Sequence, residues 1–344
     1  MKLKFKLLVL ILGLGCITAQ AADYTRNEHA SWVKSQIKAL DVTNKFGTIT
    51  INDFGGDSVV VDVLISLENT NEKKAEALLD QIQIKMRRVG DVLNLETVIN
   101  DDFKTKGNFS IDYTINIPAD RDLAVTNKFG NIVLNNLDAK GTFNLGYGNM
   151  NAGKLNAPAA GKISLTIAYG KADIESVNHL QADVKYSKLF IGDAQSIQAE
   201  SKYSVFNVEK MGELILESKY DGINVDEIEL LRANSKYTNY DIEVLKQALI
   251  LDTQYGSVRI SKIAESFENI EVTNSYGGIE LGLNRANYII DAVCDYCDIR
   301  YPETEFKGNR EKRDHSFTLQ GTVGSQSNKK VSIKSRYGGI KLMN

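Results

Sequence analysis

The stretch from residue 196 to residue 263 contains one motif four times in succession. The copies read SIQAESKYSVFNVEKM (196–211), ELILESKYDGINVDEI (213–228), LLRANSKYTNYDIEVL (230–245) and ALILDTQYGSVRISKI (248–263). Their tyrosines, Tyr203, Tyr220, Tyr237 and Tyr255, are 17, 17 and 18 residues apart. A short fixed period with its apolar positions in step is typical of a solenoid, in which each repeat stacks on the next.

The apolar positions within one copy indicate two strands. With the tyrosine counted as position 0, the apolar residues fall at −6, −4, +3, +5 and +8; in the first copy these are Ile197, Ala199, Phe206, Val208 and Met211. Alternate residues share one face of a strand but not one face of a helix. Turn-forming residues follow the tyrosine, namely Ser204, Asp221, Thr238 and Gly256. We therefore expect an all-β fold, a parallel β-solenoid, wound right-handed as most parallel crossovers are.

The motif extends over most of the chain. KFGTITI at 45–51 returns as KFGNIVL at 128–134, and position 0 is aromatic twelve times, at Phe46, Phe129, Tyr147, Tyr169, Tyr186, Tyr203, Tyr220, Tyr237, Tyr255, Tyr276, Tyr296 and Tyr337. This predicts about 11–12 rungs. We expect a lead-in and first rung at 22–54, an insertion at 55–122, rungs at 123–302, a loop or hairpin excursion at 303–330 and the last rung at 331–344.

The insertion at 55–122 has a different pattern, which predicts a small α+β element. Residues 58–67 are β-branched, Asn71 is placed to cap a short helix, and residues 81–98 alternate around a turn at Gly90. We expect this element to cover the strand edges at the first end of the solenoid, because open edges recruit other chains.

Composition and the N-terminus indicate an exported protein. The chain has 344 residues, is 43% hydrophobic and carries a net charge of −3, which does not favour nucleic-acid binding. Residues 1–21 have the basic start, apolar run and Ala19-Gln20-Ala21 ending of a secretory signal peptide. In an alternative interpretation Cys16 is the lipidated first residue of a lipoprotein. Both place the protein in the periplasm or on the surface of a bacterium.

A family resemblance rests on short phrases. KFGTITI, KFGNIVL, SYGGIEL (275–281) and RYGGIKL (336–342), with INIPAD at 115–120, resemble the "putative adhesin" β-solenoid family of bacterial cell envelopes, whose relatives include head GIN domain proteins. The resemblance covers nearly the whole mature chain. It implies a secreted or surface-facing parallel β-helix and implies no catalytic residues.

The tyrosine column is the first candidate site. Position 0 shares the parity of the apolar −4 and −6 positions, so we expect an inward-facing structural ladder of stacked rings at Tyr186, Tyr203, Tyr220, Tyr237, Tyr255 and Tyr276. Binding of sugar rings or bases is the alternative. Position −2 has the same parity but is polar, and its residues must find partners inside; they are Asn44, Asn127, Ser201, Ser218, Ser235, Thr253, Asn274 and Ser335.

Charged columns are expected on the outer face. Lysines at −1 (185, 202, 219, 236) lie beside acids at −3 (183, 200, 217, 252), which either neutralise them or leave a surface for an anionic glycan. At +6, Glu209, Asp226 and Glu243 would stack about 4.8 Å apart. Such a column either binds calcium, the one cofactor we consider, or splays its carboxylates into water.

The remaining reactive residues suggest little chemistry. Cys294 and Cys297 are expected to form a disulfide across a corner, with two free thiols as the alternative. Asp221, Asp226, Asp241 and Glu243 are the clustered carboxylates available to a catalyst.

The sequence thus favours a non-enzymatic exported rod, an adhesin or envelope interaction protein. Its partner would be a glycan or a surface protein, with membrane contact only through Cys16. A polysaccharide lyase or hydrolase, and an envelope protein with no dedicated ligand, are the alternatives.

Overall fold

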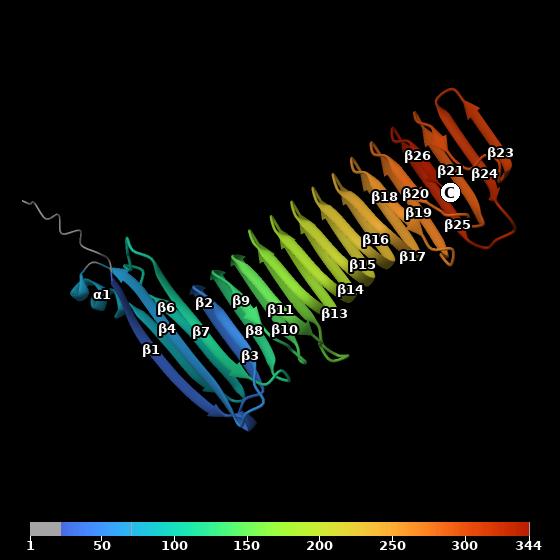
Figure 1. Ribbon diagram of the computed structural model, residues 1–344. Helices are drawn as coiled ribbons and strands as arrows, with labels where there is room; N and C mark the ends of the chain where they lie inside the picture. The colour runs from blue at the N-terminus through green and yellow to red at the C-terminus, as the bar shows by residue number, and fades with distance from the viewer. Residues whose placement is uncertain (1–21, 70, 344) are drawn as a thin grey trace, which may run out of the picture.

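The computed structural model describes residues 22–69 and 71–343, and it is an elongated rod of stacked strands (Figure 1). The strands are parallel along most of the rod, so the predicted all-β, parallel β-solenoid is confirmed. The predicted signal peptide, residues 1–21, and the predicted lipid-anchor residue Cys16 lie outside the described residues. Within residues 22–69 and 71–343, no helix has the length and apolar character needed to cross a membrane.

The central rungs follow the repeat. Five long strands each run from one position 0 to the next: β13 (Lys171–Lys185), β14 (Lys188–Lys202), β15 (Val205–Lys219), β16 (Gly222–Lys236) and β17 (Asn239–Gln254). Neighbours pair in parallel and in register, so that Val208 lies beside Val225 and Lys202 beside Lys219. The apolar positions fill the interior, where Phe206, Leu214 and Ile223 are fully buried.

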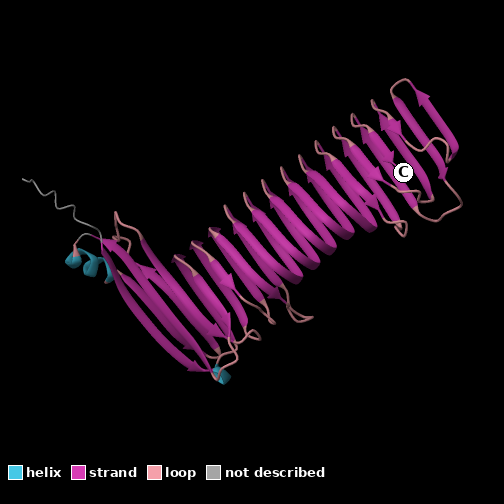
Figure 2. Cartoon of the chain, in the orientation of Figure 1, coloured by secondary structure: helices cyan, strands magenta, loops and turns pink. Residues whose placement is uncertain are grey.

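Shorter strands form the remaining rungs in the same way, two or more per rung. They are β2 (Ala39–Phe46), β3 (Ile49–Asp53), β8 (Asp122–Phe129), β9 (Ile132–Leu134), β10 (Gly141–Tyr147), β11 (Asn149–Leu155), β12 (Ile163–Ala168), β18 (Val258–Ile263), β19 (Asn269–Ser275), β20 (Ile279–Gly282), β21 (Tyr288–Asp295), β22 (Ile299–Arg300), β25 (Lys330–Arg336) and β26 (Ile340–Met343). Loops of different length connect them at the corners, while the strands keep register (Figure 2).

The first end of the rod is extended by strands from the insertion. β6 (Val92–Ile99) pairs with β2, and β5 (Ile82–Val89) pairs antiparallel with β6. On the other side, β7 (Phe109–Ile117) pairs with β3, followed by β4 (Ser58–Asn69) and β1 (Ala22–Val33), both antiparallel. A short 3-10 helix, η1 (Lys34–Gln36), follows β1.

Two polar groups organise this end. Asn71 caps the helix α1 (Glu72–Leu79), because its side chain accepts a hydrogen bond from the Lys74 backbone N–H at 3.0 Å. Arg26 of β1 donates through Nη1 to the Leu79 carbonyl at 2.8 Å and through Nη2 to the Ile82 carbonyl. The guanidinium therefore joins β1 to the start of β5, the two outermost strands.

The rung order at the second end differs from the chain order. β25 pairs with β19 on one side and with β21 on the other, and β26 lies between β20 and β22. The rung of β25 and β26 is the last in sequence but lies between two other rungs in space. The period identifies which residues form a rung but not which rungs are neighbours. A hairpin of β23 (Phe306–Arg313) and β24 (Ser316–Val323) completes the end by pairing with β21.

Candidate functional site

The position-0 side chains form one continuous stack of rings along the rod. Centroids of neighbouring rings are 4.6–5.3 Å apart from Phe46 through Tyr276, Tyr337 and finally Tyr296. The planes are nearly parallel in the centre, with 1° between Tyr203 and Tyr220. His315, in the turn of the β23–β24 hairpin, stacks on Tyr296 at 4.7 Å.

The facing expected for these tyrosines is wrong: the rings point outward. All ten tyrosines of the ladder are 41–51% exposed. For nine of the ten the reason lies in the backbone, because from Tyr169 to Tyr337 each ladder tyrosine has a left-handed φ between +50° and +61°. One left-handed residue interrupts the alternation of the strand, so parity counted from −4 does not carry through the corner.

Ring stacking and backbone strain are of similar size at this corner. A left-handed conformation costs a non-glycine residue about 1–2 kcal/mol. A stacked aromatic pair contributes about 0.5–1.5 kcal/mol, and each interior ring has two such neighbours. The stack consumes both faces of every interior ring, so a sugar can meet only ring edges and hydroxyls along the rod. The ladder is therefore a stabilising element whose exposed side is polar.

A column of small polar groups lies beneath the ladder. The predicted inward facing of position −2 is correct, since all eight residues there are at most 4% exposed. They satisfy the corner: Asn44 Nδ2 donates to the Phe46 and Ile111 carbonyls at 2.8 Å, and Ser335 Oγ to the Gly338 carbonyl at 2.5 Å. Buried polar groups need such partners, and these hydrogen bonds hold their corners closed.

Asp221 is a buried carboxylate in this network. It is 4% exposed, and it accepts hydrogen bonds from Ser218 Oγ at 2.6 Å and from the backbone N–H groups of Ser204 at 2.7 Å and Lys219 at 3.2 Å. Burial raises the pKa of Asp221 above its ordinary value, although these hydrogen bonds oppose the shift. The neighbouring rungs place Ser204 and Thr238 at the same corner position, so the carboxylate replaces a hydroxyl.

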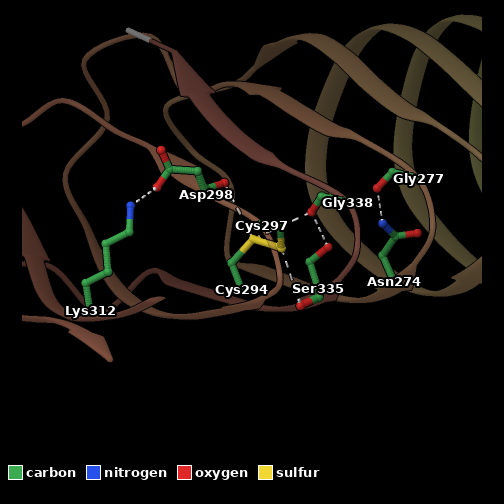
Figure 3. Close-up of a disulfide and its surroundings, with 8 residues drawn as sticks. All are labelled: Asn274, Gly277, Cys294, Cys297, Asp298, Lys312, Ser335 and Gly338. Carbon is green, nitrogen blue, oxygen red and sulfur yellow. Dashed lines mark hydrogen bonds and ion pairs between the residues drawn. A yellow bond between two sulfur atoms is a disulfide. The ribbon is translucent and has the colours of Figure 1, made fainter. Parts of the chain in front are cut away.

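A disulfide occupies the equivalent corner near the second end of the rod. Cys294 at −2 and Cys297 at +1 are bonded, with their Cα atoms 5.3 Å apart. In the two rungs drawn beside it, Asn274 and Ser335 instead donate hydrogen bonds to the carbonyls of Gly277 and Gly338 (Figure 3). The disulfide therefore makes covalent the −2 to +1 contact that these two neighbouring rungs make by hydrogen bonding.

The charged columns lie on the outer surface. The four lysines at −1 are exposed and in register along β13 to β16. Lys185 Nζ is 2.9 Å from Asp183 Oδ2, which raises the pKa of Lys185. Such exposed pairs contribute little to stability.

The acidic column at +6 is also exposed. Glu209, Asp226 and Glu243 lie at a bend of the rung where strand pairing skips one residue. Across the described part of the chain, no group of three or more His, Cys, Asp or Glu side chains is arranged to hold a metal ion. Calcium binding by this column stays a prediction.

The clustered carboxylates do not converge on one surface. Asp221 is buried at the first corner, whereas Asp241 is exposed on β17 and Asp226 is exposed at the +6 bend of its rung. The repeat places Asp221 at the corner after Tyr220, but it does not show that the carboxylate is buried there.

The rod and its repeated columns define an all-β solenoid with a periodic surface. No protein-family model matches the chain, and no curated protein matches it in sequence. Solved structures from bacteria are similar. A putative adhesin from Bacteroides fragilis is 13% identical over 92% of this chain and 97% of its own, with a TM-score of 0.33.

Two further solved structures give comparable values. A putative cell adhesion protein from Clostridium sporogenes is 9% identical over 93% of this chain and 99% of its own, with a TM-score of 0.21. A putative lipid binding protein from Parabacteroides distasonis is 10% identical over 74% of this chain and 96% of its own, with a TM-score of 0.32. Their names describe those proteins, and the fold of this chain rests on its own strand pairing.

Proposed function

We propose that this chain is an exported, non-enzymatic adhesin, a rigid rod whose surface binds a glycan or a protein of the bacterial envelope. The observation that carries the proposal is the fixed register of the rungs, which repeats the same exposed side chains about every 4.8 Å. A rigid surface loses little conformational entropy on binding, and a repeating partner can contact several rungs at once.

Other features support the same role. Residues 1–21 have the pattern of a secretory signal, and Cys16 offers a lipid anchor in the alternative interpretation. Two of the similar solved structures carry names that refer to adhesion, and a third carries a name that refers to lipid binding. We place the protein in the periplasm or at the cell surface.

A glycan array and a depolymerisation assay on the mature chain, each with and without calcium, test this function. Saturable binding without product supports the adhesin. Reproducible release of shorter saccharides identifies a polysaccharide-active enzyme instead. No binding to glycans, and none to envelope proteins in a pull-down, overturns the proposal and leaves a structural envelope protein.

A further inference from the structure

Two adjoining hollows lie at the second end of the rod. The first, of about 490 Å³, is lined by the outer faces of β18, β20, β26 and β22. The second, of about 470 Å³, is lined by residues from the end of β22 and from the β23–β24 hairpin. This hairpin lies at the upper right in Figure 1. They share Asp298 and Arg300, so they form one depression that runs along several rungs and onto the tip. We call it the C-terminal trough.

The side chains at two outward positions shape the first hollow. Position +2 carries Gly278 and Gly339 in neighbouring rungs, and a Cβ atom built on Gly278 would meet nothing within 4 Å. Position +4 shares the same face and carries long side chains in the spatial order Arg259, Glu280, Lys341 and Arg300. The glycines at +2 therefore form the floor of the trough, and the long side chains at +4 form its side.

The charge balance of the trough is positive. Each of its three acids has a cation beside it, in the pairs Glu280–Lys341 at 3.2 Å, Asp298–Lys312 at 3.4 Å and Glu303–Arg310 at 3.6 Å. Arg259 and Arg300 are exposed and form no ion pair with any other described residue. Three rung steps separate them, about 14 Å along the axis. Two guanidinium groups are thus free for a ligand, in a chain whose net charge is −3.

The same position elsewhere on the rod carries no cation. In the rungs before Arg259, position +4 is occupied by Thr50, Val133, Asn151, Asp173, Phe190, Asn207, Asn224 and Asp241. Two hollows lie over that part of the rod, and acids outnumber cations in both: one is lined by Asp173, Glu209 and Asp226, and the other by Asp173, Glu175, Asp193 and Glu209 with Lys154 and Lys210. The positive character therefore belongs to the second end of the rod and is not a general property of the repeat.

The tip adds two aromatic rings to the second hollow. Tyr301 and Phe317 are half-buried and pack edge to face, with centroids 6.4 Å apart. Arg310 Nη1 donates to the Tyr301 hydroxyl at 3.3 Å, and Lys312 Nζ lies 5.5 Å from the Phe317 centroid. An aromatic ring beside fixed polar groups suits a sugar ring, which has apolar C–H faces and polar edges. Guanidinium groups suit carboxylates, which they bind in a bidentate manner.

We propose that the C-terminal trough binds a linear oligosaccharide of uronic acids, with its chain along the rod axis. Arg259 and Arg300 bind two carboxylates of the chain, and the sugar at the tip lies against Tyr301 and Phe317. The ladder cannot supply this contact, because its interior rings are covered on both faces by each other. The inference rests on the proposed function and specifies where the rod binds and which class of glycan it selects.

Isothermal titration calorimetry with tetragalacturonate tests the site. The test variant is Arg259→Gln/Arg300→Gln, and the matched control is Lys202→Gln/Lys236→Gln, which removes two exposed positive charges from the lysine column. Maltotetraose is the neutral probe of equal length. We expect the wild type to bind tetragalacturonate at least tenfold more tightly than maltotetraose, the arginine variant to lose at least tenfold, and the lysine variant to change less than twofold.

Several outcomes would overturn this inference. Equal affinity in all three proteins, loss confined to the lysine variant, or equal binding of the neutral probe would each place the glycan elsewhere or change its class. If the wild type binds other glycans of the array but not tetragalacturonate, the proposal that the trough binds uronic acids is overturned, whereas the proposed adhesin function is not. No binding to any glycan or envelope protein overturns both. Matching melting temperatures of the three proteins establish that the variants are folded.

Discussion

At the scale of single residues, the ladder tyrosines are surface residues that stabilise by stacking. We expect Tyr220→Asp to cost about 1–3 kcal/mol, the value of two lost ring contacts, because the new carboxylate remains in water and aspartate tolerates a left-handed backbone. Tyr220→Phe keeps both contacts and should change stability by less than about 0.5 kcal/mol.

Tyr240 is the control for this prediction. It lies at +3 and is 1% exposed, so Tyr240→Asp strands a charge in the core and should prevent folding. Urea titrations of the three variants make the measurement. If Tyr220→Asp were as damaging as Tyr240→Asp, the outward facing of the ladder would be wrong.

Asp221 gives the stability a pH dependence of known sign. Its pKa is raised in the folded state, so between its ordinary value and the raised value the folded chain binds more protons than the unfolded chain. The contribution of Asp221 is therefore most favourable at low pH and declines as pH rises through this interval. Each unit of pKa shift corresponds to about 1.4 kcal/mol.

Asp221→Ser, which copies the residue of the preceding rung, removes this dependence. The free energy of unfolding of the wild type, relative to the variant, should fall as pH increases from about 4 to 7. Urea titrations of both proteins at several pH values measure the difference. Parallel curves would show that Asp221 titrates normally in the folded chain.

The acidic column at +6 makes a prediction about calcium. If Glu209, Asp226 and Glu243 share a calcium ion, the ion stabilises the folded state by mass action, and the melting temperature should rise in excess calcium relative to a chelator. Asp226→Asn, at the centre of the column, should abolish the rise. A melting temperature that calcium does not change would remove this site.

At the scale of elements, several corners are closed by a contact between positions −2 and +1, as in Ser218–Asp221, Asn274–Gly277, Ser335–Gly338 and the Cys294–Cys297 disulfide. We expect the disulfide of the Tyr296 rung to add about 2 kcal/mol, the chain-entropy value for a loop of only four residues. Cys294→Ser/Cys297→Gly copies the Ser335 and Gly338 pair of the next rung and should fold. Dithiothreitol should lower the melting temperature of the wild type and leave that of the variant unchanged, whereas an unaffected wild type would contradict the role of the bond.

The sequence predicted the elements that depend on alternation and missed those that depend on the backbone at the corner. The −2 column, the cap at Asn71 and the strands of each rung follow from residue type and period, and the structure contains them. The facing of Tyr220 does not, because a left-handed φ leaves no trace in a pattern of apolar residues. The C-terminal trough was missed for another reason. Arg259 and Arg300 are 41 residues apart in sequence, and the repeat does not predict that β26 lies between β20 and β22, which places Lys341 beside Arg300.

At the scale of the whole molecule, the rod is a one-dimensional array in which stability is a sum over rungs and the interfaces between them. The two ends break this regularity in different ways. At the first end, strands of the insertion pair with both strands of the first rung, β6 with β2 and β7 with β3, and Arg26 joins the outermost strands. At the second end, β25 and β26 follow β19 to β22 in sequence, yet they lie between the rungs that those strands form. The packing of this end therefore depends on residues 330–343.

Two deletions of 17 residues each compare the loss of an ordinary interior rung with the loss of the rung formed by β25 and β26. Removing residues 204–220 takes out one interior rung, but the flanking rungs share its register and can form a new interface, so the net loss is one rung and one interface. Removing residues 328–344 takes out one rung and both of its interfaces, and leaves β21, β22 and the hairpin without their link to β19 and β20. We expect the interior deletion to give a folded rod about 4.8 Å shorter by small-angle scattering. The terminal deletion should have the lower melting temperature and be cleaved by protease within residues 283–327. Equal melting temperatures and equal protease resistance of the two deletion variants would mean that the rungs at this end do not depend on the rung of β25 and β26.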